Sequence, residues 1–441
     1  MNEASQQEAA ATSAAPTFAE ALRVWVKIGV LSFGGPAGQI ALMHRVLVDE
    51  KKWIDEQRFL AALNFCMLLP GPEATQLATY VGWRLHGVKG GAAAGLLFVM
   101  PGALVILALS MLYGAFGNLP LVEGLFVGIK AAVLAIVMEA LLRISRRALK
   151  SPFDWTIAGA AFVAIFFLAV PFPLVVLAAA LAGMLGSTRL NQSERPGVRS
   201  QSSPVSAAAT LRTIGIWLAM WFLPLLALVH ALPDRPVLGD MAVLYSKLAV
   251  VTFGGAYAVL TYIADQAVNT YGWLEPGEMV DGLGLAETTP GPLILVNAFV
   301  AYLGALRSVE EGGSMVTGVL GWAVALWATF APCFLWIFAG APYIDRLNAQ
   351  PLLKGALGAI TAAVVGVILN LTIWFALNVL FAAVSERHVG LLRLYIPDPE
   401  TLVWPALALS AVAFFLLLVL RRGIITTLAL CGALAFGWTL L

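Results

Sequence analysis

The residues of this chain that could do chemistry lie in short motifs inside apolar segments. A hydroxyl residue followed by Phe-Gly-Gly forms the first motif, beginning at Ser32, and Pro-Gly-Pro forms the second, beginning at Pro70. Consecutive glycines accept positive φ and let a ligand approach the backbone closely. Prolines break a helix, and the N–H groups at a new helix start attract anions. These residue types predict a site for a small oxyanion that requires no metal and no cofactor.

Both motifs occur twice, and the two occurrences of each are 220 positions apart. Further along the chain Pro101 matches Pro332 at an offset of 231, which an insertion near 307–314 explains. This agreement predicts a tandem duplication. The candidate substrate-binding residues of the first copy are Lys27, Ser32, Phe33, Gly34, Gly35, Gln39, Pro70, Gly71, Pro72, Thr75 and Gln76. Those of the second copy are Lys247, Thr252, Phe253, Gly254, Gly255, Pro290, Gly291, Pro292 and Asn297.

The role of the lysines and of the glycines has more than one interpretation. Lys27 and Lys247 each stand six residues before the phenylalanine of their copy. A basic residue in an apolar segment faces a cavity or a partner, extends to the membrane interface, or pairs with Glu20 or Asp240, seven residues earlier. The paired glycines also suit close packing of helices. Because two copies carry two motifs each, we favour a binding site.

Glu73 has no counterpart in the second copy, where Leu293 occupies the equivalent position. A carboxylate inside a membrane is typical of proton relays, so we predict Glu73 as a candidate for proton coupling. The alternative is a charge at a helix start, stabilised by backbone N–H groups. Glu139 and Glu287 are weaker candidates of the same kind.

Composition places the chain in a membrane. Hydrophobic residues make up 60% of it, charged residues 12%, and the mean hydropathy is +0.88. Residues 90–122 and 155–188 carry no Asp, Glu, Lys or Arg, and a helix needs about 20 apolar residues to cross a bilayer. The lipid bilayer is therefore the expected surrounding. A net charge of +1 argues against nucleic-acid binding, for which a basic face is expected.

The polar segments divide the chain. We expect a disordered tail at 1–17, a first repeat at 18–188, a cytoplasmic linker with one extra span (211–232) at 189–238, and a second repeat at 239–441. Residues 44–58 include four basic side chains, whereas the equivalent residues 264–281 have only acidic ones. Basic loops face the cytoplasm, so the two repeats are predicted to have opposite orientations.

The expected fold class is an all-α polytopic membrane protein with two inverted-topology homologous halves and broken or re-entrant helices. If the motif segments enter the membrane and return, the chain makes about nine crossings, and every basic loop lies inside. If the motif segments cross fully, the number of membrane segments is nearer 13. Inverted repeats are typical of secondary transporters, whose substrate binds near the midplane of the membrane.

Residues 33–39 (Phe-Gly-Gly-Pro-Ala-Gly-Gln), followed by residues 70–78, resemble the long-chain chromate transporter family, and the resemblance extends from Phe18 to Leu441. It implies a multi-pass protein of the bacterial inner membrane that exports chromate and confers chromate resistance, with sulfate as a competing anion. The family also contains single-repeat members that work in pairs of opposite orientation. The direction of transport follows from this resemblance alone.

Three functions remain in comparison. The first is a chromate transporter driven by the membrane potential, by proton coupling or by both. The second is a carrier of sulfate-like oxyanions, because sulfate and chromate are both tetrahedral dianions. The third is a membrane-embedded enzyme acting on lipid phosphates. Such chemistry requires a cluster of Asp, His or Arg, and this sequence has no such cluster. The residues leave open the preferred anion, the coupling ion and the oligomeric state, a homodimer included.

Overall fold

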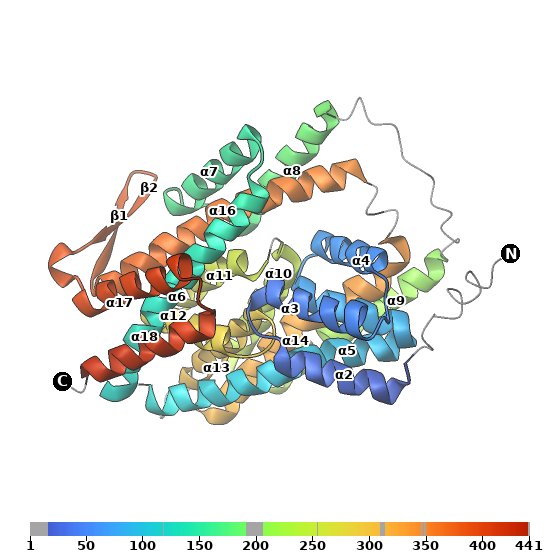
Figure 1. Cartoon of the computed structure of the whole chain (residues 1–441), viewed down its shortest axis with the longest axis horizontal. Coiled ribbons are helices and arrows are strands. Elements are labelled where there is room, and N and C mark those ends of the chain that lie inside the picture. The colour runs from blue at the N-terminus through green and yellow to red at the C-terminus, as the bar shows by residue number, and fades with distance from the viewer. Residues whose placement is uncertain are drawn as a thin grey trace.

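The computed structural model describes residues 16–439, except 118, 191–205, 254, 309–313, 345, 346, 348 and 349. The predicted tail and most of the predicted linker lie outside this described part, as does Gly254. Helices make up nearly all of the described chain (Figure 1).

The first repeat contains a series of helices joined by short turns. They are α2 (Phe18–Leu31), α3 (Gly35–His44), η1 (Arg45–Glu50), α4 (Glu56–Leu68), α5 (Glu73–Phe116), α6 (Pro120–Ala148), α7 (Pro152–Phe166) and α8 (Phe172–Leu190). After the linker, the apolar helix α9 (Ala207–Ala231) contains the extra span expected at 211–232.

The helices of the second repeat follow the same order, with two helices in place of α5 and with several short added elements. Its elements are α10 (Pro236–Val251), α11 (Ala256–Ala264), η2 (Asp265–Thr270), α12 (Pro276–Thr288), η3 (Leu293–Leu295), α13 (Val296–Arg307), α14 (Met315–Gly340), η4 (Ala341–Tyr343), α16 (Pro351–Leu380), β1 (Val384–Val389), β2 (Leu392–Pro397), η5 (Pro399–Thr401), α17 (Trp404–Phe414), η6 (Phe415–Val419) and α18 (Ile424–Thr439). The π-helices η1 and η2, and the helices α4 and α12, begin 220 positions apart. The duplication seen in the sequence is therefore also a duplication of elements.

The last two helices of each repeat pack on the other repeat. Helices α7 and α8 lie along α16, whereas α17 and α18 lie along α6. Equivalent small residues make these contacts: a Cβ added at Gly183 would lie 2.6 Å from the Cβ of Ala359, and one added at Gly128 would lie 2.8 Å from that of Ala435. Small residues let membrane helices approach closely. The repeats are thus interlocked by an exchange of helix pairs.

Length and exposure identify the protein as a multi-pass membrane protein. Within the described residues, five helices are long and apolar enough to cross a bilayer, namely α5, α6, α9, α14 with η4, and α16. Helix α9 exposes large apolar side chains, including Leu211 and Leu223, which in a membrane contact lipid. Helix α5 has a break at His86 and Gly87, where Gly87 has φ 62°, so its 44 residues form two segments.

One element departs from the all-α expectation. Strands β1 and β2 form an antiparallel hairpin that pairs Val384 with Pro397 and Val389 with Leu392. Gly390 has φ 63° in the turn. Alternating side chains and this glycine were a signal for the hairpin. It is the reason that α17 and α18 follow α7 and α8 by 252 positions instead of 231.

Candidate functional site

Each Pro-Gly-Pro loop is hydrogen-bonded to the Phe-Gly-Gly loop of the other repeat. The N–H of Gly71 donates to the carbonyl oxygen of Thr252 at 2.7 Å, and the N–H of Gly291 donates to that of Ser32 at 2.7 Å. These four residues are equivalent in pairs, so the two bonds are symmetric copies of one contact. A site formed here needs both repeats, which neither motif alone indicates.

Positive φ requires glycine at the turns of these loops. The φ angles are 86° at Gly34, 70° at Gly35, 112° at Gly71, 97° at Gly255 and 93° at Gly291. Residues other than glycine rarely adopt these φ angles. A Cβ added at Gly34 or Gly35 would meet nothing within 4 Å, so the backbone angle and not space demands glycine there.

The hydroxyl groups of Ser32 and Thr252 are used inside their own helices. The Ser32 Oγ donates to the Ile28 oxygen at 2.6 Å, and the Thr252 Oγ1 donates to the Leu248 oxygen at 2.5 Å. A serine or threonine at a helix end commonly bonds the carbonyl four residues earlier. In this structure both hydroxyl protons are therefore engaged at a helix end, and neither is directed at the cavity.

A small cavity lies where the four motif loops meet. The starts of α3, α5, α11 and η3 surround it, and its lining includes Pro36, Gln39, Glu73, Thr252, Ala256 and Leu293. Helix starts carry partial positive charge and free N–H groups. The cavity has a volume of about 10 Å³, room for about one water molecule. A tetrahedral oxyanion is larger, so the surrounding loops must separate to admit one.

The Glu73 side chain reaches across this cavity towards the second repeat. Its carboxylate oxygen lies 3.9 Å from the position that a Cβ on Gly255 would occupy. The half-buried Glu73 is the first residue of α5, whereas Gly255 precedes α11. The one carboxylate that the motifs contribute thus occupies the region that would attract an anion.

Four side-chain oxygens of the motif residues are buried without a hydrogen-bond partner, and the residue that bears one of them, Gln39, lines the cavity. They are Gln39 Oε1, Thr75 Oγ1, Gln76 Oε1 and Asn297 Oδ1. The Gln39 Nε2 donates to the Gly291 oxygen at 2.5 Å, and the Gln76 Nε2 donates to the Pro70 oxygen at 2.7 Å. Buried polar groups normally have partners, so these four oxygens are available to accept a hydrogen bond. Three of the four belong to the first copy.

The structure does not bring the two lysines into this site. Lys27 and Lys247 are both exposed, on the outer faces of α2 and α10. Glu20 instead pairs with Lys51, at 2.8 Å. In a membrane protein such lysines extend towards the interface. The two lysines were expected to line the anion site. In the structure they lie on the faces of α2 and α10 that are turned away from the protein interior.

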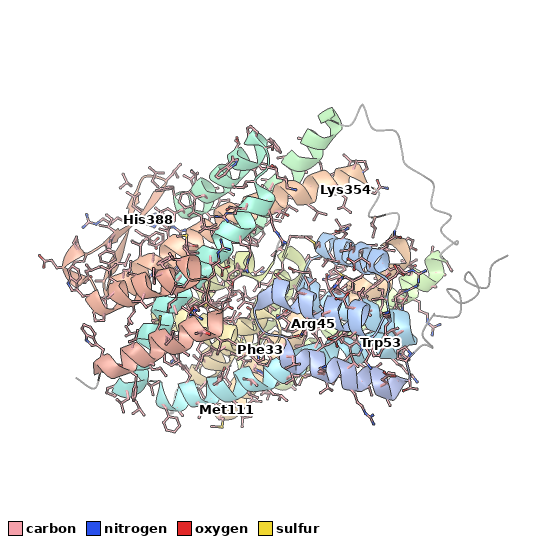
Figure 2. The ribbon with its side chains drawn as sticks, viewed as in Figure 1. Phe33, Arg45, Trp53, Met111, Lys354 and His388 are labelled. Carbon is pink, nitrogen blue, oxygen red and sulfur yellow. The ribbon has the colours of Figure 1, made fainter. Side chains whose placement is uncertain are left out.

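The remaining motif residues frame the loops. Phe33, Phe253 and Pro70 are half-buried, whereas Pro72, Pro290 and Pro292 are buried. Phe33 lies near the centre of the view in Figure 2, and His388 on the hairpin lies near its edge.

Two residues that pack on the Pro-Gly-Pro loops were not predicted from the sequence. A Cβ added at Gly102 would lie 1.8 Å from the Pro290 oxygen, and Cys333 Sγ lies 3.5 Å from a Cβ built on Gly71. Gly102 and Cys333 are equivalent, since each follows one of the paired prolines Pro101 and Pro332. That pairing was the signal that could have found them.

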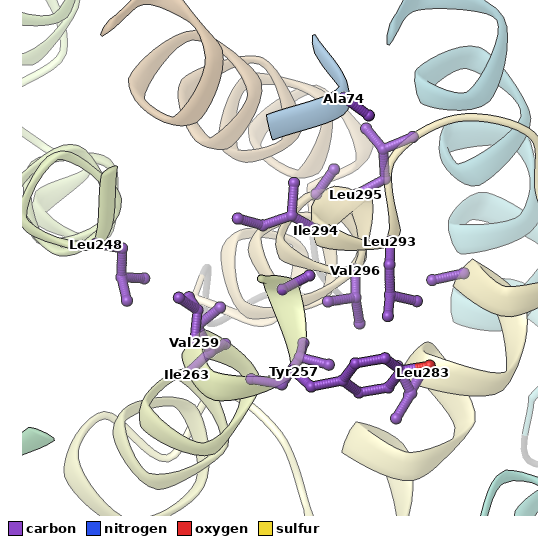
Figure 3. Close-up of a cluster of buried hydrophobic side chains, with 14 of the residues drawn as sticks. Ala74, Leu248, Tyr257, Val259, Ile263, Leu283, Leu293, Ile294, Leu295 and Val296 are labelled. Carbon is purple, nitrogen blue, oxygen red and sulfur yellow. The ribbon is translucent and has the colours of Figure 1, made fainter. Parts of the chain in front are cut away.

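Helix α12 of the second repeat carries buried carboxylates. Asp281 accepts a hydrogen bond from the Tyr113 hydroxyl at 2.8 Å and pairs with the Lys130 ammonium at 3.3 Å. Glu287 accepts a bond from the Tyr257 hydroxyl at 2.6 Å. Figure 3 shows the Tyr257 ring extending from α11 towards Leu283 of α12, beneath an apolar layer that includes Leu293 and Val296. Asp281 was not singled out by the sequence, because acids in that loop were read only as an orientation signal.

Broken helices from two homologous repeats that meet around a polar site are typical of secondary transporters. Comparison with known families agrees with this class. A family described as "Chromate transporter" matches residues 19–184 and again residues 239–438. The chain belongs to this chromate transporter family, and it is a transporter and not an enzyme.

Several curated relatives match most of the chain. The "Chromate transport protein" of Pseudomonas aeruginosa is 32% identical over 358 residues, which cover 78% of this chain and 77% of the relative. The "Chromate transport protein" of Cupriavidus metallidurans is 28% identical, covering 82% and 84%. "Uncharacterized transporter YwrB" of Bacillus subtilis is 32% identical over 32% of this chain and 72% of its own length. No solved structure matches the chain.

Proposed function

We propose that this protein exports chromate across a bacterial inner membrane and thereby confers chromate resistance. The relatives named as chromate transport proteins support the substrate. The observation that carries the mechanism is the pair of equivalent bonds, Gly71 to Thr252 and Gly291 to Ser32, around a cavity of helix starts. Backbone N–H groups and helix dipoles recognise an oxyanion by its charge.

An inverted arrangement of the repeats fits the direction of the helices. Helix α16 begins at the right of the view, where Figure 2 labels Lys354, and ends at the left beside the hairpin. Its equivalent α6 begins at the lower left and ends beside the start of α7 (Figure 1). The two helices pack on one another and run in opposite directions. Opposite directions are what inverted repeats require, and in transporters built from inverted repeats the substrate site lies near the midplane.

The cavity must enlarge before an oxyanion can enter, and the equivalent bonds provide two ways to enlarge it. Opening the contact between Gly71 and Thr252 exposes the cavity on one side. Opening the equivalent contact between Gly291 and Ser32 exposes it on the other. Alternating access by movement of one repeat against the other follows this pattern.

The membrane potential alone can drive export. A dianion leaving a cell that is negative inside releases about 2.3 kcal/mol per charge at 100 mV. For the two charges of a dianion this free energy supports a concentration outside the cell about a thousandfold higher than inside, because each tenfold ratio of concentrations costs about 1.4 kcal/mol.

Proton coupling through Glu73 would add to this driving force. An ionised Glu73 occupies the region that attracts the substrate, so binding of a dianion requires Glu73 to move or to take up a proton. Glu73→Gln should then transport chromate at a rate that no longer responds to a pH gradient. Unchanged transport with an unchanged response to the gradient would remove Glu73 from the coupling mechanism.

Labelled chromate uptake into inverted vesicles tests the proposed function. With an inside-positive potential we expect accumulation, and sulfate and molybdate as competitors rank the oxyanions. Absence of accumulation at every potential would contradict export. Stronger transport of sulfate than of chromate would instead assign the site to a sulfate-like oxyanion.

A further inference from the structure

Two cavities outside the motif site occupy equivalent places in the two repeats. The arginine cavity, of about 850 Å³, is lined by Glu139, Arg143, Arg146, Arg421 and Arg422, among others. The hairpin cavity, of about 250 Å³, is lined by residues that include Ala169, Asn370, Trp374 and Arg393.

The equivalence of the two cavities extends to single residues. Asn370 and Trp374 follow Glu139 and Arg143 by 231 positions, and Arg421 follows Ala169 by 252. Arg421 has φ 52° and Ala169 has φ 51°, so the backbone turns in the same unusual way at both places. If the repeats are inverted, these two cavities open on opposite sides of the membrane.

The two cavities differ in charge. Four arginines line the arginine cavity, and its single carboxylate, Glu139, pairs with Arg143 at 3.7 Å. The hairpin cavity has one arginine, Arg393, which pairs with Asp265 at 3.8 Å. A cavity with an excess of positive charge concentrates anions and raises their rate of association. Only the arginine cavity has this property.

The buried Glu287 of α12 lies within electrostatic range of Arg143 and Glu139, which line the arginine cavity. Glu287 in turn accepts the hydrogen bond of Tyr257, which is the second residue of α11. The first residue of α11, Ala256, lines the motif cavity. The Glu287–Tyr257 pair therefore connects the electrostatic surroundings of the arginines to the start of α11 at the motif site.

We propose that the arginine cavity is a binding site for tetrahedral dianions, which receives the substrate from the cytoplasm before it reaches the motif site. This inference rests on the proposed function. Basic residues accumulate on the cytoplasmic side of membrane proteins, which places the cavity at the intake side for export. Arginine suits this ligand because its planar fork binds oxyanions through two parallel N–H groups.

The phosphate of an anionic lipid headgroup shares this chemistry, and the arms of one experiment distinguish the two sources. The double variant Arg421→Gln/Arg422→Gln is compared with a matched control, Arg45→Gln/Arg58→Gln, which removes two exposed arginines outside the cavity. Each purified protein is reconstituted in vesicles of zwitterionic lipid and in vesicles that also contain anionic lipid. Initial chromate transport is measured over a range of substrate and salt concentrations, on proteins oriented with the cytoplasmic side accessible.

We expect the cavity variant to raise KM for chromate about tenfold at low salt, with little change in kcat, and to lose most of the dependence on salt. The control should keep the wild-type KM. The defect should be equal in both kinds of vesicle. A KM equal to that of the control overturns the inference, and so does a defect confined to vesicles with anionic lipid, because the arginines then serve headgroups. Failure of the wild-type protein to transport chromate contradicts the proposed function instead.

Discussion

The two copies of the motif site share a backbone and differ in side chains. Gln39, Glu73 and Gln76 in the first copy correspond to Val259, Leu293 and Val296 in the second. The second set is buried and apolar (Figure 3). The equivalent glycine turns and the equivalent cross-repeat bonds remain in both copies. Symmetry of the scaffold thus supports movement, while the polar groups that can contact a ligand belong mainly to the first copy.

The largest effect is expected where the two repeats differ in the residue that packs against the Pro-Gly-Pro loop, Gly102 in one and Cys333 in the other. Gly102→Ala places a methyl group against the Pro290 oxygen, whereas the equivalent substitution Cys333→Ala only removes a sulfur. Overpacking costs about 1–3 kcal/mol, and here it displaces the loop that bonds to Ser32. We expect Gly102→Ala to lower the thermal midpoint and abolish chromate transport. Cys333→Ala should keep a thermal midpoint near that of the wild type and a chromate transport rate within a few-fold of it. Equal loss of chromate transport in the two variants would contradict the packing argument.

The second largest effect is expected from a substitution that gives the first copy of the motif site the residue of the second copy. Gln39→Val removes the donor to the Gly291 oxygen and leaves that buried oxygen unpaired. An unpaired buried acceptor costs about 1–3 kcal/mol, so transport should fall about tenfold or more. Val259→Leu serves as the matched control at the equivalent position in the second copy. Wild-type chromate uptake by Gln39→Val in vesicles would show that the first copy has no special role.

A smaller and equal effect is expected at the hydroxyl positions. Ser32→Ala and Thr252→Val each remove a bond within one helix, to Ile28 and to Leu248. Such a bond contributes about 0.5–1.5 kcal/mol. Both variants should lose a few degrees of thermal stability and keep their KM for chromate. A tenfold rise in KM in either variant would return that hydroxyl to the list of substrate ligands.

The smallest effect is expected at the lysines. Lys27→Met and Lys247→Met change exposed side chains that lie outside the site. Transport kinetics in vesicles should stay within about twofold of the wild-type values, as is usual for surface substitutions of about 0.5 kcal/mol or less. Loss of chromate affinity in both variants would mean that α2 and α10 rotate during transport and bring the lysines inward.

The sequence predicted the apolar helix α9 and the loops at Gly71 and Gly291. These features depend on local properties: proline and glycine break helices wherever they stand, and an apolar run of sufficient length favours a span. The hairpin at 384–397 was not predicted because its strands are short and the first is mainly polar, so the segment resembles a loop in an otherwise helical chain. The exposure of Lys27 was missed because a period of 3.6 residues fixes a helix face but not the side on which the protein lies.

By itself, the sequence determined that this is a duplicated membrane protein of the chromate transporter family, since composition, motif spacing and family resemblance are written along the chain. Only the tertiary structure decided that Gly71 bonds to Thr252 and Gly291 to Ser32, and that the arginines at 143, 146, 421 and 422 line one cavity. Contacts of this kind join segments more than 150 positions apart. They depend on how the helices of one repeat pack against those of the other, which no local pattern of residues encodes.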